Sequence, residues 1–368
     1  TTGNTLSLHD ALPISPIVFT SGRAVRGTAD YEADTAQWLG LSLNGRAPIN
    51  NCNDDGATPG SADCEEDGEG NAGLYGGDDE ADDSGSLRYV RVEFAGIFLN
   101  EEDQSNGIQF LGTGSGTEVE FVQVHNNGDD GLEFFGGTTN AKYVVVTGAR
   151  DDAIDWTDGW QGNVQYAIIE HSDSDYAFEG DSRSASSPDV SPRSIPQVAN
   201  FTIVGDGVAP GARFREGMGG AFLNGIFANT ATGIDIDDEG TLDGTYEELQ
   251  NGGLIIEAHF VDAGTAIVDD SPDEGFDADA VLALIDVTPG DNTMEGFSFY
   301  GKTDVGVVPG ANEAAVVAYD FTSGTDLPRE DLDGFFEETN FIGAVQNADD
   351  DWYLGWTVDS EGNLTGSN

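Results

Sequence analysis

Basic residues, cysteines and long apolar runs are all scarce in this chain of 368 residues. Lysine and arginine together number 13 against 69 aspartates and glutamates, and only Lys142 and Lys302 are lysines. The formal net charge of -56 repels the phosphates of nucleic acids and of anionic membranes, so neither is expected as a partner. No run of about twenty apolar residues occurs, so no membrane-spanning segment is expected.

The only cysteines, Cys52 and Cys64, flank a loop rich in aspartate and glycine. In a secreted protein, a disulfide that closes this loop is the expected arrangement. Two free thiols or half of a metal site are the alternatives. Zinc is disfavoured because the spacing is not that of a CxxC pair and no histidine lies nearby.

Sequence signatures of the common enzyme families are also missing. No GxSxG, P-loop, HExxH or dinucleotide-binding fingerprint occurs. His125 and His171 follow matching apolar segments and are expected at the surface or in turns rather than as catalysts. No motif in the sequence therefore indicates a particular enzymatic reaction.

A repeated five-residue pattern dominates what is present. It reads Asp-Asp-Gly-Leu-Glu from Asp129, returns from Asp151 and returns again from Asp175, a period of about 22 to 24 residues. The fourth position is apolar in every copy: Ile108, Leu132, Ile154, Phe178, Phe214 and Ile234. The fifth position is polar: Gln109, Glu133, Asp155, Glu179, Arg215 and Asp235. This alternation is that of a β-strand with one side chain inward and the next outward.

A second series of β-branched and aromatic segments lies between these copies. Its members begin at Tyr89, Phe121, Tyr143, Tyr166 and Phe201. Two or three short strands in each coil of this length predict an all-β right-handed parallel β-helix. Leucine-rich repeats share the period, but their leucine and asparagine consensus is absent.

The chain divides into three parts by pattern. Residues 1–15 resemble a translated sequencing adapter and are set aside as a scar that adds no coil, so Leu6, Leu8 and Leu12 are expected outside the core. Residues 16–270 are predicted to form the β-helix, with Ser182 to Pro196 as a loop inserted on one coil. Residues 271–368 are predicted to cap its open end, with a short helix over 277–285.

Several segments also resemble a known family. They are PIVFTS from residue 16, WLGLSLNGRAPIN from 38, YGGDDEADDSGSLRYVRVEFAG from 75, GDDGLEFFGGTTNAKYVVV from 128 and FIGAVQNADDDWYLGWT from 341. The chain resembles secreted or surface-attached bacterial β-helix proteins, many of them labelled lipoproteins. The resemblance runs from Pro16 to about Thr357 and implies an extracellular or cell-surface location, but no established activity.

The repeated acids form the best candidate site. If positions one, three and five point outward, Asp129, Asp151 and Asp175 stack on consecutive coils, and so do Glu133, Asp155 and Glu179. Parallel strands lie about 4.8 Å apart, so these like charges raise one another's pKa or recruit a cation. The predicted ligand-binding residues are Asp129, Glu133, Asp151, Asp155, Trp156, Trp160, Glu179, Arg213 and Arg215. In the alternative interpretation, Asp-Asp-Gly only makes a turn and the aromatic rings belong to the core.

Calcium is the predicted cofactor, because its preferred ligands are carboxylate and carbonyl oxygens. The predicted metal ligands are Asp151 and Asp155 on the row, and Asp78, Asp79, Asp82 and Asp83 in an acidic loop without the EF-hand pattern. A solvated turn is the alternative for that loop. Adaptation to salt also explains the acidic composition, and both explanations can hold together.

These observations favour a non-catalytic extracellular or surface β-helix protein that binds glycans or other partners, stabilised by Ca²⁺. A Ca²⁺-dependent polysaccharide lyase or glycoside hydrolase is the alternative, with an arginine as base or charge neutraliser. A polysaccharide or cell-surface glycan is the expected partner under either interpretation.

Overall fold

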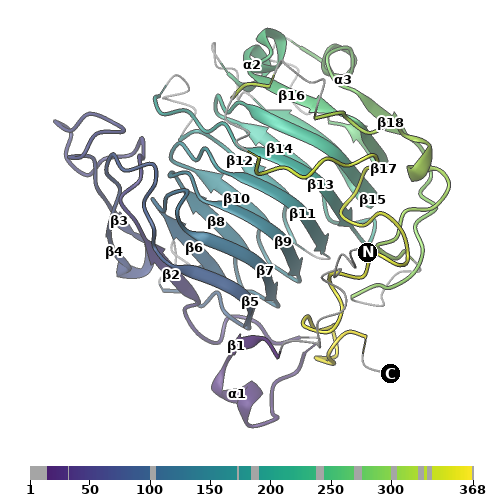
Figure 1. The fold of residues 1–368 in the computed structure, drawn as a ribbon, viewed down its shortest axis with the longest axis horizontal. Coiled ribbons are helices and arrows are strands. Elements are labelled where there is room, and N and C mark those ends of the chain that lie inside the picture. Colours follow the sequence, from purple (N-terminus) through teal and green to yellow (C-terminus); the bar gives the residue numbers. More distant parts are fainter. Residues whose placement is uncertain are drawn as a thin grey trace, which may run out of the picture.

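The repeats stack as coils of a parallel β-helix in the computed structural model (Figure 1). Residues 15–31, 33–99, 105–171, 174–183, 190–237, 244–268, 276–299, 305–321, 327–329 and 334–366 are described. The segment that the sequence sets aside as a scar, with Leu6, Leu8 and Leu12, lies outside these residues except for the exposed Ser15. The predicted fold class is confirmed.

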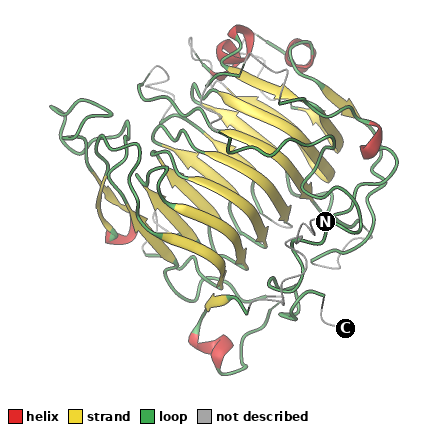
Figure 2. Ribbon diagram, viewed as in Figure 1, coloured by secondary structure: helices red, strands yellow, loops and turns green. Residues whose placement is uncertain are grey.

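Strands of the large sheet stand in two columns and pair in parallel with the coil before and the coil after (Figure 2). The first column holds β1 (Ile17–Phe19), β5 (Ser86–Glu93), β7 (Glu118–His125), β9 (Asn140–Thr147), β11 (Asn163–Glu170) and β13 (Gln197–Val204). The second column holds β2 (Leu41–Asn44), β6 (Ile108–Leu111), β8 (Leu132–Phe135), β10 (Ile154–Thr157), β12 (Phe178–Gly180) and β14 (Ala212–Arg215).

The long strand β15 (Gly220–Asp237) belongs to both columns. Its first part pairs with β13, and its last part pairs with β14. After it come β16 (Leu254–Glu257), β17 (His259–Ile267) and β18 (Val287–Pro289). A separate antiparallel hairpin, β3 (Glu66–Gly68) and β4 (Gly73–Tyr75), is joined by the 3-10 turn η2 (Glu69–Asn71). The helices are α1 (Gly22–Val25), α2 (Thr245–Asn251) and α3 (Ala278–Leu282), with the 3-10 turn η3 (Glu313–Ala315).

The core is a stack of inward side chains that repeats from coil to coil. Ile154 and Trp156 of β10 alternate inward with Asp155 between them. The rings of Phe110 and Phe134 stack at 4.8 Å, and Phe134 stacks on Trp160 at 4.1 Å. Every second side chain of a strand is buried, so a shift by one residue would expose the apolar side chains. This alternation therefore fixes the register of each coil.

A column of left-handed residues bends the first-column strands. Tyr89, Phe121, Tyr143 and Tyr166 have φ between 53° and 62°, and their rings stack at 4.5, 4.4 and 5.0 Å. Non-glycine residues adopt this conformation rarely, and the ring stacking offsets its cost. The predicted alignment of Phe201 with these rings is wrong, because the next residues in the column are asparagines.

Asn200 and Asn224 take the left-handed position on the following coils, with φ of 53° and 56°. Phe201 is paired with Ala167 and turns into the core. Asparagine accepts this backbone conformation more readily than other chiral residues. The aromatic column therefore gives way to an asparagine column with no change in the path of the chain.

The prediction that residues 271–368 cap the open end stays a prediction, and the described parts of this region lie in two places. Helices α2 and α3 supply Leu249 and Val281 to the main core beyond β15, so this part lies at the end of the stack (Figure 1). Residues 334–366, here called the C-terminal strap, run back along the outer face of the first column instead. Phe341 binds Asn200, Glu337 binds Gln165, and Val358 binds Gln123.

The strap covers apolar side chains that point outward from the first column. Val145 and Ile168 pack against Val345 and Trp356 of the strap in one buried cluster. Gln123 donates to the Val358 carbonyl at 2.9 Å and accepts from its N–H at 2.8 Å. None of the described helices is both long and apolar enough to cross a membrane.

Candidate functional site

Outward side chains of the second column form a polar row across the coils. The strand pairings place these residues in register: Ser42, Gln109, Glu133, Asp155, Glu179, Arg213 and Asp235. Each side chain points away from the core because its two neighbours on the strand point inward. The fifth positions of the predicted repeat therefore do share one face.

One register is two residues off the prediction. Arg213 pairs with Glu179, whereas the sequence aligned Arg215 with it. Ala212 and Phe214 are both buried, so alternation alone fits either register. The structure corrects the fourth position from Phe214 to Ala212 and places Arg215 opposite Asp237.

Two carboxylates that the sequence did not single out, Asp130 and Asp152, lie beside the row. Asp130 accepts from the N–H of Asp152 at 2.8 Å, and Asp152 accepts from the N–H of Tyr176 at 2.6 Å. They precede strands β8 and β10, where the alternation assumed for positions one and three does not apply. The second aspartate of each Asp-Asp pair in the repeat was the sequence signal that could have identified them.

We call Asp129, Asp130, Glu133, Asp151, Asp152, Asp155 and Glu179 the carboxylate row. Burial raises the pKa of Asp130, Glu133, Asp152 and Asp155 well above the ordinary range, and neighbouring carboxylates raise each further. Burial together with Asp151 raises the pKa of Asp129 to about 7. The row therefore holds charge only where something compensates it.

Three overlapping groups in the row have their oxygens within 4.8 Å of one another, close enough to share a metal ion. The groups are Asp129 with Asp130 and Asp151, Asp130 with Glu133 and Asp155, and Asp152 with Asp155 and Glu179. Oxygen-only groups of this kind suit Ca²⁺ better than softer metals. Of the predicted metal ligands, Asp151 and Asp155 belong to these groups.

Both predicted arginines lie at the downstream end of the row and are paired with acids. Arg215 lies 2.8 Å from Glu179 and 3.9 Å from Asp181. Arg213 lies 3.6 Å from Glu179 and also pairs with Asp237, and its guanidinium stands 5.8 Å from the Tyr176 ring. These contacts neutralise part of the row without any bound ion.

The predicted ligand-binding role of Trp156 and Trp160 is wrong. Both side chains are wholly buried and pack among the rings of the core. Trp156 follows Asp155 on β10, so the alternation that turns the carboxylate outward turns the indole inward. Neither ring offers a surface to a ligand.

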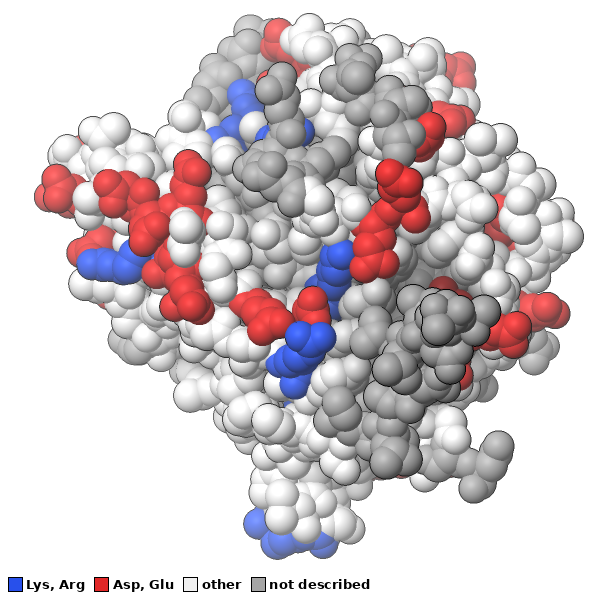
Figure 3. Space-filling model, in the orientation of Figure 1, with Lys and Arg blue, Asp and Glu red and all other residues white. Residues whose placement is uncertain are grey.

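The acidic loop predicted to bind metal is spread out rather than gathered. Asp79 accepts from the N–H of Ala81, Asp82 from the hydroxyl of Ser84, and Asp83 from the N–H of Gly85. Within the part of the chain that the structure describes, no group of three candidate ligands includes these residues or Asp78. Figure 3 shows acidic side chains gathered over the side where β3 and β4 lie. This loop resembles the solvated turn of the alternative interpretation.

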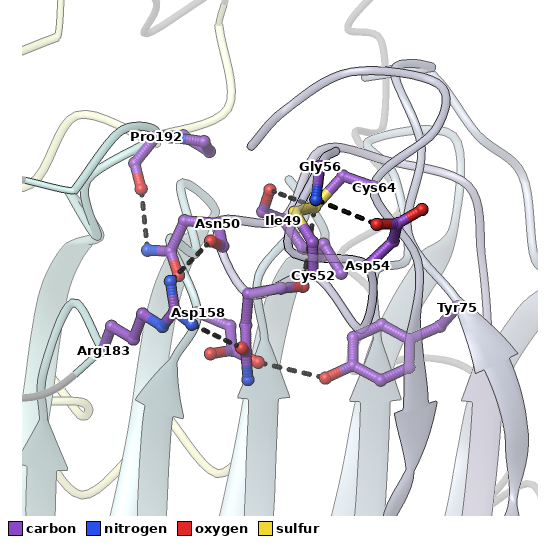
Figure 4. The surroundings of a disulfide bond; sticks show 11 residues. Ile49, Asn50, Cys52, Asp54, Gly56, Cys64, Tyr75, Asp158, Arg183 and Pro192 are labelled. Carbon is purple, nitrogen blue, oxygen red and sulfur yellow. Dashed lines mark hydrogen bonds between the residues drawn. A yellow bond between two sulfur atoms is a disulfide. The ribbon is translucent and has the colours of Figure 1, made fainter. Parts of the chain in front are cut away.

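A disulfide joins Cys52 to Cys64, and the segment around it stands next to the second column (Figure 4). Asn50 donates to the Pro192 carbonyl at 2.9 Å, and Arg183 donates to Asn51 at 3.0 Å. The hydroxyl of Tyr75 donates to Asp158 at 3.0 Å. These contacts tie the loop to residues that follow β10 and β12.

None of the histidines that the structure describes takes part in the row. His125 and His171 are buried, contrary to the predicted surface or turn positions: His125 packs beside Tyr31 and Phe94, and His171 contacts Ser174. Burial lowers the pKa of His125 to about 3 and that of His171 to about 4. Both rings are therefore neutral at physiological pH, and neither faces the carboxylates described above.

Comparison with known proteins agrees with this geometry. A family model described as a pectate-lyase-like beta helix domain matches residues 11–306. The match begins inside the segment 1–15 and includes both columns and the whole carboxylate row. No curated protein and no solved structure matches the chain. By its match over most of its length, the chain belongs to the family of pectate-lyase-like β-helix domains.

Proposed function

We propose that the chain is a non-catalytic extracellular protein that binds a glycan on the face of the second column, with Ca²⁺ held by the carboxylate row. The observation that carries this proposal is the pairing of both arginines. Burial lowers the pKa of Arg215, but Glu179 and Asp181 outweigh this effect and leave the pKa raised. A guanidinium held in this way is a poor base.

Side chains at the edge of the row suit hydroxyl-rich ligands. Asp151 and Asp175 are exposed, and Tyr176 and Arg213 are half-buried beside them. Sugar hydroxyls both donate and accept hydrogen bonds, so neighbouring carboxylates and guanidinium groups match them. The disulfide supports an extracellular location, because such bonds persist in oxidising compartments.

The test is retention of the full chain on immobilised neutral and acidic polysaccharides, with Ca²⁺ or with a chelator. We expect retention that needs Ca²⁺ and is lost in the Asp151→Asn, Asp155→Asn double variant. Asp79→Asn, in the spread-out loop, is the matched control and should behave as wild type. Failure to bind any polysaccharide in either condition would reject glycan binding.

A Ca²⁺-dependent polysaccharide lyase or glycoside hydrolase is the second candidate. The observation in its favour is that a carboxylate group and two arginines meet at Glu179 on a pectate-lyase-like scaffold. Unsaturated sugar ends would reveal lyase action by their ultraviolet absorbance, and new reducing ends would reveal either activity. Product that disappears in Arg215→Lys would favour the enzyme over the binding protein.

A further inference from the structure

The two ends of the carboxylate row are neutralised differently. At the downstream end, Glu179 has guanidinium groups at 2.8 and 3.6 Å. At the upstream end, the group of Asp130, Glu133 and Asp155 has no such partner among the ion pairs of the described residues. Carboxylates this close and this buried need a compensating positive charge or a proton.

A buried amide points to the nature of the compensation at the upstream end. Asn106 is 1% exposed and donates from Nδ2 to Glu133, while its Oδ1 has no hydrogen-bond partner. Leaving a buried carbonyl oxygen unpaired costs about 1–3 kcal/mol. A proton on one acid would neutralise that carboxyl group alone, whereas a cation with oxygen ligands would compensate several carboxylates and accept this oxygen as a ligand.

A neighbouring segment holds this amide in place. Glu69 of η2 accepts from Gln109 at 2.9 Å and from Asn106 at 3.4 Å. Gln109 in turn accepts from Ser42 at 2.8 Å. The upstream end is thus a built polar site, with side chains from three coils and from the hairpin beside them.

We propose that the row holds a single Ca²⁺, bound by Asn106, Asp130, Glu133 and Asp155, and that Arg213 and Arg215 take the place of a second cation beside Asp152 and Glu179. This inference rests on the proposal that the row binds Ca²⁺. Three carboxylates and one amide supply four of the six to eight oxygens that Ca²⁺ takes, and water supplies the rest. Asp155 belongs to both groups, so the ion and the guanidinium groups compensate adjacent parts of one row, while Asp129 and Asp151 lie beside the ion without ligating it.

The test is calorimetric titration of the chelator-treated full chain with CaCl₂. We expect one site per chain in wild type and an affinity weakened about tenfold or more in Asn106→Ala, since the site loses one oxygen. Asp79→Asn is the matched control and should keep wild-type affinity. Equal affinity in wild type and Asn106→Ala, or two sites in wild type, would overturn the inference.

A second variant tests the substitution of arginine for a cation. In Arg213→Gln, Arg215→Gln, the acids around Glu179 lose their partners, and we expect two Ca²⁺ per chain instead of one. Glu179→Gln removes a ligand of the second group only and should still bind one ion. Folding is checked by circular dichroism with Ca²⁺ and moderate NaCl present, and one ion in the folded double variant would contradict the role given to the arginines.

These outcomes separate this inference from the proposed function. If wild type binds no Ca²⁺, both fail. If it binds Ca²⁺ but Asn106→Ala changes nothing, only the assignment of the site fails. If the titrations behave as expected and no polysaccharide is retained, only glycan binding fails.

Discussion

Single residues explain why the coils accept large rings in a narrow core. Gly180 pairs with Trp156 across neighbouring strands, and a Cβ on Gly180 would lie 2.0 Å from the indole. The missing side chain therefore makes room for the largest residue of the core. Conformational freedom is not the reason for glycine here; the close approach of the ring is.

Gly180→Ala is expected to destabilise the protein by about 1–3 kcal/mol, because an added methyl group overpacks a rigid core. Denaturant unfolding followed by tryptophan fluorescence measures the change. Gly290→Ala is the matched control, since a Cβ there would meet only Phe260 at 3.4 Å. Equal unfolding midpoints for Gly180→Ala and wild type would show that the Trp156 side chain can shift to make room for the methyl group.

His259 is a buried residue that is expected to make the fold less stable at acid pH. Its ring lies among Phe201 and Phe227, and neither ring nitrogen has a hydrogen-bond partner. Burial lowers its pKa from 6.5 to about 3. The neutral ring is therefore compatible with the fold, and stability is lost as pH falls from the unfolded pKa towards the folded one.

We expect His259→Leu to lose less stability than wild type between about pH 6.5 and about pH 4, because the unfolded variant has one proton fewer to take up. Thermal unfolding at several pH values in this window measures the difference. Parallel curves for the two proteins would mean that His259 does not control the acid response.

At the scale of elements, the sequence predicted the strands of the second column better than the turns before them. The apolar fourth positions alternate with polar fifth positions, and that alternation places Glu133, Asp155 and Glu179 on one face. Asp130 and Asp152 precede the strands, so no period governs their direction. Arg213 and Arg215 were ambiguous because both have apolar neighbours on the strand.

The strap was beyond sequence reasoning for a different reason. Its contacts join residues far apart in the sequence, 141 positions between Asn200 and Phe341 and 235 between Gln123 and Val358. Residues 334–366 form no regular strand or helix there, so they carry no period to recognise. The outward Val145 and Ile168 were the available signal, because an apolar outer face needs a cover.

Gln123→Ala should loosen the strap, because it leaves the N–H and carbonyl of Val358 without their side-chain partner. We expect a loss of about 1–3 kcal/mol and faster amide hydrogen exchange in residues 352–366. Arg88→Ala is the control, since it removes only exposed ion pairs with Glu118 and Glu120. Unchanged hydrogen exchange in the strap would show that packing of its aromatic side chains is enough to keep it on the first column.

At the scale of the whole molecule, charge links stability to salt. The net charge of -56 makes the compact state repel itself. We expect the melting temperature to climb with NaCl, since ions screen this repulsion. A melting temperature that stays constant from low to molar salt would remove adaptation to salt as the reason for the acidic composition.

Protons and Ca²⁺ are expected to substitute for each other. Burial raises the pKa of Asp129 and of Asp181 to about 7, above their ordinary value of 3.8. Protonation of these groups favours the fold, so their contribution is complete at acid pH and is lost as pH rises through about 7. The buried histidines add nothing above about pH 6.5.

The melting temperature of chelator-treated protein should therefore fall between about pH 6.5 and about pH 8, and Ca²⁺ should reduce the part of that fall that comes from Asp129, because the ion compensates the ionised row. Scanning calorimetry with and without Ca²⁺ at both pH values measures the effect. If Ca²⁺ raised the melting temperature by the same amount at both pH values, its stabilising effect would not depend on the ionisation of these carboxylates.

The strap also imposes an order on the making of the protein. Synthesis proceeds from the N-terminal end, so β5 to β13 can stack before residues 334–366 exist. During that interval the outward Val145, Ile168 and the ring of Phe121 face water, although the finished molecule hides them. If synthesis stops before the strap, the stacked coils keep an exposed apolar face on the first column. The strap is made after these coils and covers an apolar face through which newly made chains would otherwise associate.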